Sequence, residues 1–371
     1  MTYPKAHDYI ARIVPFTTSG TKSSQPVKID LTTNQETLGP SPKVIALYES
    51  LAPDLHTYPD VEATRLRQAI SKHFNLNPDN IIGANGSEEI LYALPRAYCA
   101  PEDEVIFSKG SFPTYKIATY TVGAKPVEVD PIHFRINVDG ILKAITPRTK
   151  IIMIDNPGNP YSTYLTKAEI EKLIENTPSH ILILLDGAYA EYVTASDFTV
   201  GFEYVEKYPN VVISRTFSKF YGLAGMRIGW AYADNRIIET LRRLKAPFNV
   251  GTLAQQLAIT ALDDATHSER VKETNYIRRE AFRHKLEKMG FHVPESQCNF
   301  LSPSLADPKI IDGLISYLAD CGIAVRSLKG QGFPNHFRFS LSYDDNMKAL
   351  FDEIEVFLKQ SNAQLQVASY K

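Results

Sequence analysis

The sequence predicts an α/β fold, in which helices cover both faces of a mostly parallel sheet, together with a smaller α+β region. Three apolar runs rich in β-branched residues, at 150–154, 181–185 and 211–213, have the composition and length of buried strands. Segments with helical periodicity separate these runs, and strands that alternate with helices build parallel sheets. Beyond Gly290, short strand patterns alternate with amphipathic helices, which is typical of an α+β domain.

The composition describes an ordinary globular protein. The chain has 371 residues, of which 44% are hydrophobic, and a formal net charge of -2. This balance lacks the basic excess of nucleic-acid-binding proteins, and no apolar run approaches the roughly 18 residues of a membrane span. We therefore expect neither nucleic acid nor a membrane as a partner.

Three scattered cysteines, Cys99, Cys298 and Cys321, have no CxxC spacing. An odd number of distant thiols argues against a disulfide framework or a zinc site, and it fits a reducing compartment. The N-terminal residues contain prolines and charges but no apolar h-region of a signal peptide. We expect a cytoplasmic location and no bound metal.

We expect an N-terminal arm at 1–40, where prolines interrupt any long helix. The large domain is predicted at 41–250 and begins with a helix at 44–51. The small domain is predicted at 251–371, completed by the arm. Its predicted elements are helices at 252–288 and from 308 onward, strands at 299–301, 323–326 and 336–340, and a final helix that carries Met347 and Phe351.

A phosphate site is predicted where the strand at 80–83 leads into a helix. Ser87 is the predicted N-cap, followed by Glu88 and Glu89 in the first turn. The exposed N–H groups of a helix N-terminus bind phosphate, and a preceding glycine such as Gly86 lets the ligand approach. The next predicted strand, at 104–107, is followed by the aromatic residue Tyr115.

Polar clusters directly follow the three apolar runs that are predicted to form buried strands. Ligands of parallel sheets bind at the carboxyl ends of the strands, so these clusters should converge on one site. A helix with a Thr166–Glu169 capping box is predicted between the first two runs. The clusters are Asp155 to Pro160 after 150–154, Asp186 and Tyr189 after 181–185, and Thr216, Ser218 and Lys219 after 211–213.

The third cluster belongs to VVISRTFSKFYGLAGMRIGW, residues 211–230, which combines an amine with an anion site. Two hydroxyls precede Lys219, and Arg227 follows it within a glycine-spaced segment. Hydroxyls and a guanidinium bind anions, and glycines let the backbone approach a ligand closely. An amine held in such a pocket can lose its proton and react with an aldehyde cofactor.

This segment resembles the SxTxSKxxGLAGxRxG pattern of the pyridoxal-phosphate (PLP) aminotransferases of fold type I, most closely the histidinol-phosphate branch. The resemblance extends from Asn34 to Arg338. It implies a seven-stranded type of sheet, PLP as cofactor, and a small amino donor and a 2-oxo acid as substrates. Tyr58-Pro59-Asp60 matches the YPD of this family, which implies a homodimer in which Tyr58 reaches the phosphate of the neighbouring subunit's cofactor.

The resemblance also implies a role for each matching residue. Lys219 would bind PLP covalently and move the substrate proton, Asp186 would keep the ring nitrogen protonated, and Tyr115 would stack on the ring. Asn159 and Tyr189 would hydrogen-bond the phenolic oxygen of the ring. The implied phosphate ligands are Gly86, Ser87, Glu88, Thr216, Ser218 and Arg227, together with Tyr58, and the implied substrate ligands are Asn34, Arg326 and Arg338.

The sequence departs from the family pattern in two segments and at one further position. LTTNQETLGPSP carries Glu36 and Thr37 where the family has Asn and Pro, and NPGNPYS stands where the family commonly has NPNNPTG. The changed residues of the second segment are Gly158, Tyr161 and Ser162, and Phe16 replaces a frequent tyrosine. These departures lie near the expected site and leave the exact donor open.

Other functions are compatible with parts of the sequence. A nicotinamide enzyme would need GxGxxG after a first strand, whereas GLAGMRIG spaces its glycines as GxxGxxxG. A PLP-binding sensor would be expected to carry a DNA-binding segment, and nothing in the chain resembles one. Among PLP enzymes, an aromatic aminotransferase and a phosphothreonine decarboxylase remain alternatives to a histidinol-phosphate aminotransferase.

Overall fold

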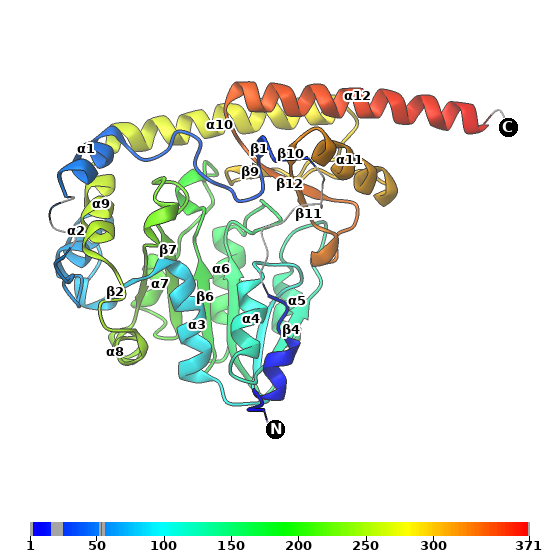
Figure 1. The fold of residues 1–371 in the computed structure, drawn as a ribbon. Coiled ribbons are helices and arrows are strands. Elements are labelled where there is room, and N and C mark those ends of the chain that lie inside the picture. Colours follow the sequence, from blue (N-terminus) through cyan, green and yellow to red (C-terminus); the bar gives the residue numbers. More distant parts are fainter. Residues whose placement is uncertain (1–2, 16–24, 52, 54–55, 370–371) are drawn as a thin grey trace.

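A computed structural model describes residues 3–15, 25–51, 53 and 56–369. A seven-stranded sheet lies among helices, and small sheets lie at one end beneath the long helices α10 (Ala265–Lys288) and α12 (Asp344–Ser369), as Figure 1 shows. These two helices contact each other through Phe282 and Phe351, whose ring centroids are 5.3 Å apart. The predicted α/β class with a mostly parallel seven-stranded sheet is confirmed.

The large sheet has the order β2-β8-β7-β6-β5-β3-β4. Strand β8 runs antiparallel to both of its neighbours, and all the other neighbouring pairs are parallel. The strands are β2 (Ile81–Ala84), β3 (Glu104–Ser108), β4 (Lys125–Val129), β5 (Thr149–Asp155), β6 (Leu182–Asp186), β7 (Val211–Thr216) and β8 (Gly229–Ala233).

Both faces of this sheet are buried, which explains why its central strands are apolar throughout. In β5, Ile151 and Met153 pack into one hydrophobic core, whereas Ile152 and Ile154 pack into the core on the opposite face. Helices α3 (Gly86–Tyr98), α4 (Thr114–Tyr120) and α8 (Asn235–Leu244) contribute to the first core. The second core receives α1 (Pro42–Ser50), α2 (Thr64–Phe74), α5 (Val138–Lys143), α6 (Lys167–Glu175), α7 (Phe202–Val205) and α9 (Thr252–Leu262).

Of the two helix caps expected from the sequence, one is present in the structure and the other is not. The capping box is confirmed, because Glu169 N donates to Thr166 Oγ1 over 3.3 Å and Thr166 N donates to Glu169 Oε2 over 2.8 Å. Ser87 is not the N-cap that we expected. Helix α3 begins at Gly86, whose φ of +70° favours glycine, so Ser87 lies within the first turn.

The smaller part of the molecule has its own hydrophobic core. Its three-stranded antiparallel sheet has the order β11-β12-β9, and a separate pair joins β1 (Ile29–Asp30) to β10 in parallel. A third core forms between these strands, α11 and α12. The bounds are β9 (Phe300–Leu301), β10 (Ile323–Ala324), β11 (Arg326–Ser327), β12 (Phe337–Ser340) and α11 (Pro308–Asp320).

The described parts of the N-terminal arm lie in two places. The short 3-10 helix η1 (Asp8–Arg12) packs near α4. Its Tyr9 lies close to Gly123, in the turn between α4 and β4. Strand β1 instead joins the small sheets through β10. Further 3-10 helices within the described residues are η3 (Pro78–Asn80), η4 (Ala190–Tyr192), η5 (Ala224–Met226) and η6 (Lys329–Gln331).

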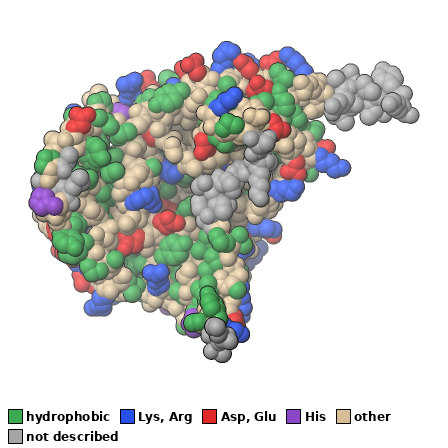
Figure 2. All heavy atoms as spheres, in the orientation of Figure 1, with side chains coloured by type: hydrophobic (Ala, Val, Ile, Leu, Met, Phe, Trp, Pro, Cys, Tyr) green, Lys and Arg blue, Asp and Glu red, His purple; other side chains and the backbone are tan. Residues whose placement is uncertain are grey.

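The surface in Figure 2 carries interspersed acidic and basic side chains, without one sign gathered over the visible face. This face therefore gives no electrostatic footprint of the kind that nucleic acid requires. Among the helices of the described residues, none is long and apolar enough to cross a bilayer.

Candidate functional site

A cavity of about 260 Å³ lies at the carboxyl ends of β5, β6 and β7, beneath the small sheets. The parallel register of these strands brings together polar clusters that are far apart in the chain. All three expected clusters contribute to its wall. The residues that line it are Thr32, Thr33, Asn34, Ser87, Glu88, Phe112, Pro113, Asp155, Asn159, Asp186, Ala188, Tyr189, Thr216, Ser218, Lys219, Arg227, Arg326, Gln331 and Arg338.

The Lys219 amine projects into this cavity and donates to the carbonyl oxygen of Thr33 over 2.9 Å. Burial, with the nearby charges of Arg338 and Arg227, lowers the pKa of Lys219 to about 8. A neutral amine is therefore accessible at mild pH, as covalent reaction with an aldehyde requires.

Asp186 is buried at the end of β6, where its carboxylate accepts two side-chain hydrogen bonds. Ser214 Oγ donates to Oδ1 over 3.0 Å, and Tyr115 OH donates to Oδ2 over 3.1 Å. Burial raises the pKa of Asp186 to about 6, although these hydrogen bonds act in the opposite direction. A buried carboxylate of this kind can hold a proton on a ring nitrogen.

The structure corrects the expectation for Tyr115. This side chain is fully buried on α4, supports Asp186 from behind, and is not part of the cavity wall. Phe112 lines the cavity instead, with its ring perpendicular to that of Tyr115 and the centroids 6.2 Å apart. The surface on which an aromatic ligand could stack is therefore provided by Phe112, three residues earlier.

Polar and cationic side chains suited to an anion gather where α3 meets the lysine segment. Arg227 Nη1 donates to Ser218 Oγ over 3.2 Å, and Arg227 Nη2 lies 3.8 Å from Glu88 Oε2. Glycines at two positions allow the start of α3 and the lysine segment to pack this closely. A Cβ at Gly86 would lie 2.6 Å from Arg227 Nη2, and a Cβ at Gly229 would lie 2.3 Å from Ser87 N.

Two arginines lie opposite this anion site, on the small-sheet side of the cavity. Arg326 and Arg338 are directly paired across β11 and β12. Arg338 is buried and donates to Asn159 Oδ1 over 2.5 Å, and burial lowers its pKa to about 10. Its Nε has no hydrogen-bond partner among the described residues, so a buried donor remains available for an anionic ligand.

Asn34 and Tyr189 complete this side of the cavity. Asn34 Nδ2 donates to the Tyr189 hydroxyl over 2.9 Å, and both side chains are buried. The ring of Phe300 lies edge-on to Tyr189 at 5.2 Å and lies 5.3 Å from the guanidinium of Arg338. Phe300 therefore packs against both groups without lining the cavity itself.

Tyr58 lies apart from this cavity. Its side chain is 78% exposed and stacks on Phe248 with the ring centroids 4.5 Å apart. It lines a separate surface groove together with Pro59, Met226 and Phe248. Within one chain, Tyr58 and Lys219 therefore belong to different pockets.

The two changed residues of the first departing segment, Glu36 and Thr37, do not face the cavity. The hydroxyl of Tyr192 donates to Glu36 Oε2 over 2.5 Å, and Thr37 Oγ1 donates to the carbonyl oxygen of Leu341 over 2.8 Å. Neither residue is among the described residues that line the cavity. Both side chains are engaged in structural hydrogen bonds, while Phe16 lies outside the described residues.

In the second departing segment, two changed residues fit each other. The ring of Tyr161 is fully buried, and its hydroxyl lies 2.9 Å from Ser108 Oγ and donates to the carbonyl oxygen of Lys109. A Cβ at Gly158 would lie 2.9 Å from Tyr161 Cδ2. Glycine at 158 therefore makes room for the tyrosine at 161, while Asn159 still lines the cavity.

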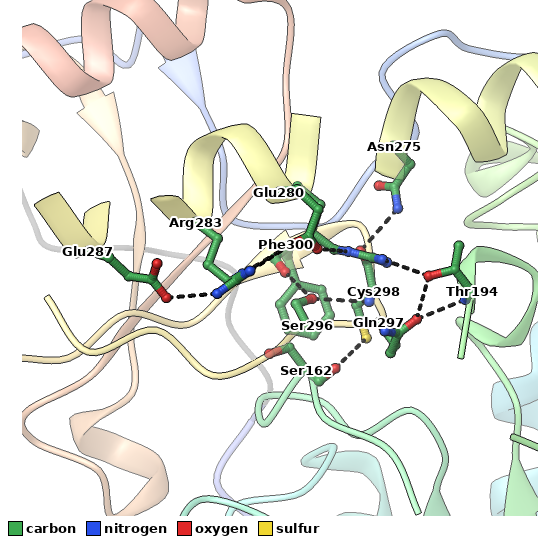
Figure 3. Close-up of polar contacts among 11 residues, drawn as sticks. Ser162, Thr194, Asn275, Glu280, Arg283, Glu287, Ser296, Gln297, Cys298 and Phe300 are labelled. Atoms are coloured by element: carbon green, nitrogen blue, oxygen red, sulfur yellow. Dashed lines mark hydrogen bonds and ion pairs between the residues drawn. The ribbon is translucent and has the colours of Figure 1, made fainter. Parts of the chain in front are cut away.

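A network of polar contacts connects α10 and residues 296–300 to two loops of the large sheet (Figure 3). Gln297 N donates to the carbonyl oxygen of Ser162 over 2.8 Å, while Gln297 Oε1 accepts from Thr194 N over 2.8 Å. Arg279, which is fully buried on α10, donates to Thr194 Oγ1 over 3.1 Å. The network fixes the loops that carry Asn159 and Tyr189 relative to the small sheets.

Several wall residues carried no expected role. Phe112 follows a strand as Tyr115 does, so spacing alone does not separate the two aromatics. Asp155 follows a predicted strand directly, and this position at a strand's carboxyl end could have indicated that it lies in the ligand site. Thr33 contributes a backbone oxygen, and Gln331 comes from η6 and donates to the carbonyl oxygen of Gly110 over 2.7 Å. No sequence pattern identifies these two.

The donor set fits PLP and does not fit a metal ion. The cavity offers an amine, a buried carboxylate, an aromatic wall and a cationic, glycine-bordered pocket, which match the aldehyde, ring nitrogen, ring face and phosphate of PLP. Within the described parts of the chain, no three His, Cys, Asp or Glu side chains are grouped so as to hold a metal.

Comparison with known sequences agrees with this chemistry. The chain matches the model of the family described as aminotransferase class I and II over residues 26–354. A histidinol-phosphate aminotransferase of Rhodospirillum centenum (strain ATCC 51521 / SW) is 37% identical over 330 residues, which are 89% of this chain and 91% of that protein. One of Rhodopseudomonas palustris (strain TIE-1) is 36% identical over 364 residues, which are 97% of this chain and 100% of that protein.

Solved structures share the fold. The histidinol-phosphate aminotransferase of Sinorhizobium meliloti, in complex with pyridoxal-5'-phosphate, superposes with a TM-score of 0.87 at 24% identity, covering 91% of this chain and 92% of that chain. An aspartate aminotransferase variant of Thermus thermophilus gives a TM-score of 0.82 at 19% identity, covering 96% of this chain and 100% of that chain.

Proposed function

The chain belongs to the class I and II aminotransferases, and from this premise we propose that it transfers the amino group of L-histidinol phosphate to 2-oxoglutarate with PLP as its cofactor. The relatives named as histidinol-phosphate aminotransferases, which cover nearly the whole chain, support this substrate. The reaction is a step of histidine biosynthesis, and we propose a cytoplasmic enzyme.

The observation that carries the proposal is the pair of arginines in the cavity wall. Histidinol phosphate has no carboxylate, so its phosphate must be recognised by cations, whereas 2-oxoglutarate brings two carboxylates to the same place. Arg326 and Arg338 are paired across β11 and β12, and both line the cavity. Two guanidinium groups can serve both half-reactions, because each binds an oxyanion with two parallel hydrogen bonds.

The cavity residues divide the remaining work. PLP, when bound, supplies the electron sink of the reaction. Lys219 would hold the cofactor covalently and, once released, remove the proton from the amino-bearing carbon of the substrate. Asp186 would hold a proton on the ring nitrogen, Asn159 and Tyr189 would orient the phenolic oxygen, and Phe112 would cover the ring face.

The phosphate of the cofactor would bind between α3 and the lysine segment. Each proposed ligand offers a hydrogen-bond donor, which is a backbone N–H, a hydroxyl or a guanidinium. We propose that these donors converge on the phosphate at the N-terminus of α3. The carboxylate of Glu88 instead pairs with Arg227 and accepts from Thr114 Oγ1 over 2.9 Å, so we propose that it orients this arginine. The ligands proposed within one chain are Gly86, Ser87, Thr216, Ser218 and Arg227.

We also propose a homodimer with shared sites. Tyr58 is exposed in a groove bordered by Phe248 and lies outside the cavity of its own chain. A tyrosine in this position can donate its hydroxyl to a neighbouring copy without rearrangement of its own subunit. The YPD match supports the cofactor phosphate of the partner subunit as the acceptor.

The substrate is tested by comparing donors at a fixed concentration of 2-oxoglutarate. We expect kcat/KM for histidinol phosphate to exceed kcat/KM for phenylalanine, tyrosine and phosphothreonine. If phenylalanine or tyrosine is much the better donor, the enzyme is an aromatic aminotransferase. Carbon dioxide released from phosphothreonine without transfer of its amino group would instead identify a decarboxylase.

The role of the second arginine is tested with Arg326→Gln. Loss of one partner of a desolvated charge pair costs roughly 2–5 kcal/mol, so the barrier for histidinol phosphate should rise by about this amount. The half-reaction with phenylalanine should change much less, because this donor has no phosphate. The exposed Arg236→Gln is the matched control and should leave both donors unchanged. Equal losses with the two donors would contradict phosphate recognition by Arg326.

A further inference from the structure

Two neighbouring carboxyl groups line the cavity where β5 and β6 end, and the proposed reaction gives a role to only one of them. Asp155 ends β5 and Asp186 ends β6, and the two residues are direct Cα partners in the parallel register of these strands. Both are buried and both line the cavity. Side chains that are paired across parallel strands lie on the same face of a sheet, so Asp155 is a neighbour of the carboxylate proposed to contact the cofactor.

Asp155 also connects two loops that form the cavity wall. Its Oδ2 accepts from Asn159 N over 2.7 Å, and its Oδ1 accepts from Ser111 Oγ over 3.3 Å. Ser111 directly precedes Phe112, and Asn159 contacts Arg338. One carboxyl therefore fixes the loop that presents the aromatic face and the loop that presents Asn159.

The surroundings make the charge of Asp155 sensitive to its neighbour. Burial raises the pKa of Asp155 to about 7, and the negative charge of Asp186 acts in the same direction. The hydrogen bonds from Asn159 and Ser111 act against this rise. The other titratable or charged groups that face this pair or share its cavity are Tyr115, Tyr161, Tyr189, Cys298, Lys219, Glu88, Arg215, Arg227, Arg326 and Arg338.

We propose that Asp155 is a positioning residue that holds Asn159 in place and adds a second negative charge beside Asp186, where the protonated ring nitrogen of the cofactor would bind. The proposal rests on the proposed PLP chemistry. A cationic ring beside two carboxyls favours the ionised form of both, so Asp155 reinforces the protonated state of the ring that Asp186 contacts. Asp155 acts through Asn159 and Asp186 and takes no part in bond making.

Two substitutions separate the charge from the anchoring. Asp155→Asn keeps an oxygen that accepts from Asn159 N but removes the charge, whereas Asp155→Ala removes both. Asp139→Asn, an exposed carboxylate on α5, is the matched control. With the holoenzymes, we would measure PLP affinity and the pH midpoint at which the visible absorbance band of the bound cofactor titrates.

We expect Asp155→Asn to weaken PLP binding by roughly 3- to 30-fold and to lower the absorbance midpoint by roughly 0.3–1 pH unit, because a nearby negative charge no longer stabilises cationic forms of the cofactor. Asp155→Ala should show the same midpoint shift and a larger loss of affinity. An unchanged midpoint in Asp155→Asn overturns the charge role, and equal affinity of the two variants overturns the anchoring role. Absence of the band in the unsubstituted protein would refute the proposed cofactor instead.

Thermal unfolding of the cofactor-free protein gives an independent readout. A carboxyl whose folded pKa is raised binds more protons in the folded than in the unfolded state, so its ionisation destabilises the fold as pH rises from about 4 to about 7. The Tm of Asp155→Asn relative to the unsubstituted protein should therefore increase by roughly 2–6 °C across this range and then stay constant. A difference that does not change between pH 5 and pH 8 would contradict the charge role, whatever its sign.

Discussion

The Lys219 amine is surrounded by features that disfavour its protonated form. It lies in a buried cavity with the guanidinium groups of Arg227 and Arg338, and these features together lower its pKa to about 8. The hydrogen bond to the Thr33 carbonyl oxygen holds the amine in the cavity. Since only the neutral amine is a nucleophile, this environment prepares Lys219 for covalent attachment at mild pH.

This environment predicts a pH dependence for cofactor capture. Covalent capture of PLP by cofactor-free protein should rise with pH and level off above about 8, because the lowered pKa leaves the amine neutral there. Borohydride reduction and peptide mapping should place the label on Lys219. Lys219→Ala should take up no label and should lose transamination by at least about 10²–10⁴-fold, the usual contribution of a proton-transferring group. The exposed Lys207→Ala is the control, and a label on any other lysine refutes the assignment.

The sequence predicts such residues well where chemistry and position coincide. Lys219 and Asp186 are polar groups at the ends of apolar strands, so both the motif and the fold indicate them. The order of the family motifs assigns the stacking role to Tyr115. Phe112 is only three positions earlier, close to the start of α4, so spacing in the sequence does not show which of the two rings lines the cavity. Only the packing, which buries Tyr115 against Asp186, distinguishes them.

At the scale of strands and helices, burial decides which elements the sequence reveals. The central strands β5, β6 and β7 are buried on both faces and appear as apolar runs. Strand β4 lies at the edge of the sheet. It contains Pro126 and charged residues between its apolar ones, so it does not form an apolar run that would predict a strand. Strand β8 begins at Gly229, within the glycine-spaced segment, so the sequence pattern does not separate the strand from that segment.

The loop after β5 shows how two departures from a family pattern compensate each other. Gly158→Ala should cost about 1–3 kcal/mol of the free energy of unfolding, because the new Cβ would lie 2.9 Å from Tyr161 Cδ2. In the background of Tyr161→Thr the same change should cost at least about 1 kcal/mol less, since the obstructing ring is gone. Urea unfolding of both single variants and the double variant measures this coupling. Additive costs would show that the two residues are independent.

For the whole molecule, the N-terminal arm connects the small sheets to the cavity. Strand β1 pairs with β10, and the residues that follow it supply Asn34 and the carbonyl oxygen that holds Lys219. The assignment of the arm to the small domain stays a prediction from the sequence. The domain boundaries at 40 and 250 remain predictions, as does the dimer, because an interface between subunits leaves no periodic pattern in the sequence.

The shared site is tested by mixing two inactive or weakened subunits. Tyr58→Phe alone should lower activity by roughly 10- to 100-fold, as for the loss of one hydrogen bond to a charged group. If Tyr58 crosses the interface, a dimer of Tyr58→Phe with Lys219→Ala has one site with both defects and one site with neither. Random mixing of equal amounts should then restore about a quarter of the unsubstituted activity, given a symmetric dimer.

The control replaces the Lys219→Ala subunit by one that carries both substitutions, which should restore nothing. Native mass spectrometry must show mixed dimers in each case. Mixed dimers without recovery would mean that Tyr58 serves its own chain. The exposure of Tyr58 argues against that outcome, because its ring stacks on Phe248 in a groove separate from the cavity that contains Lys219 and Arg227 of the same chain.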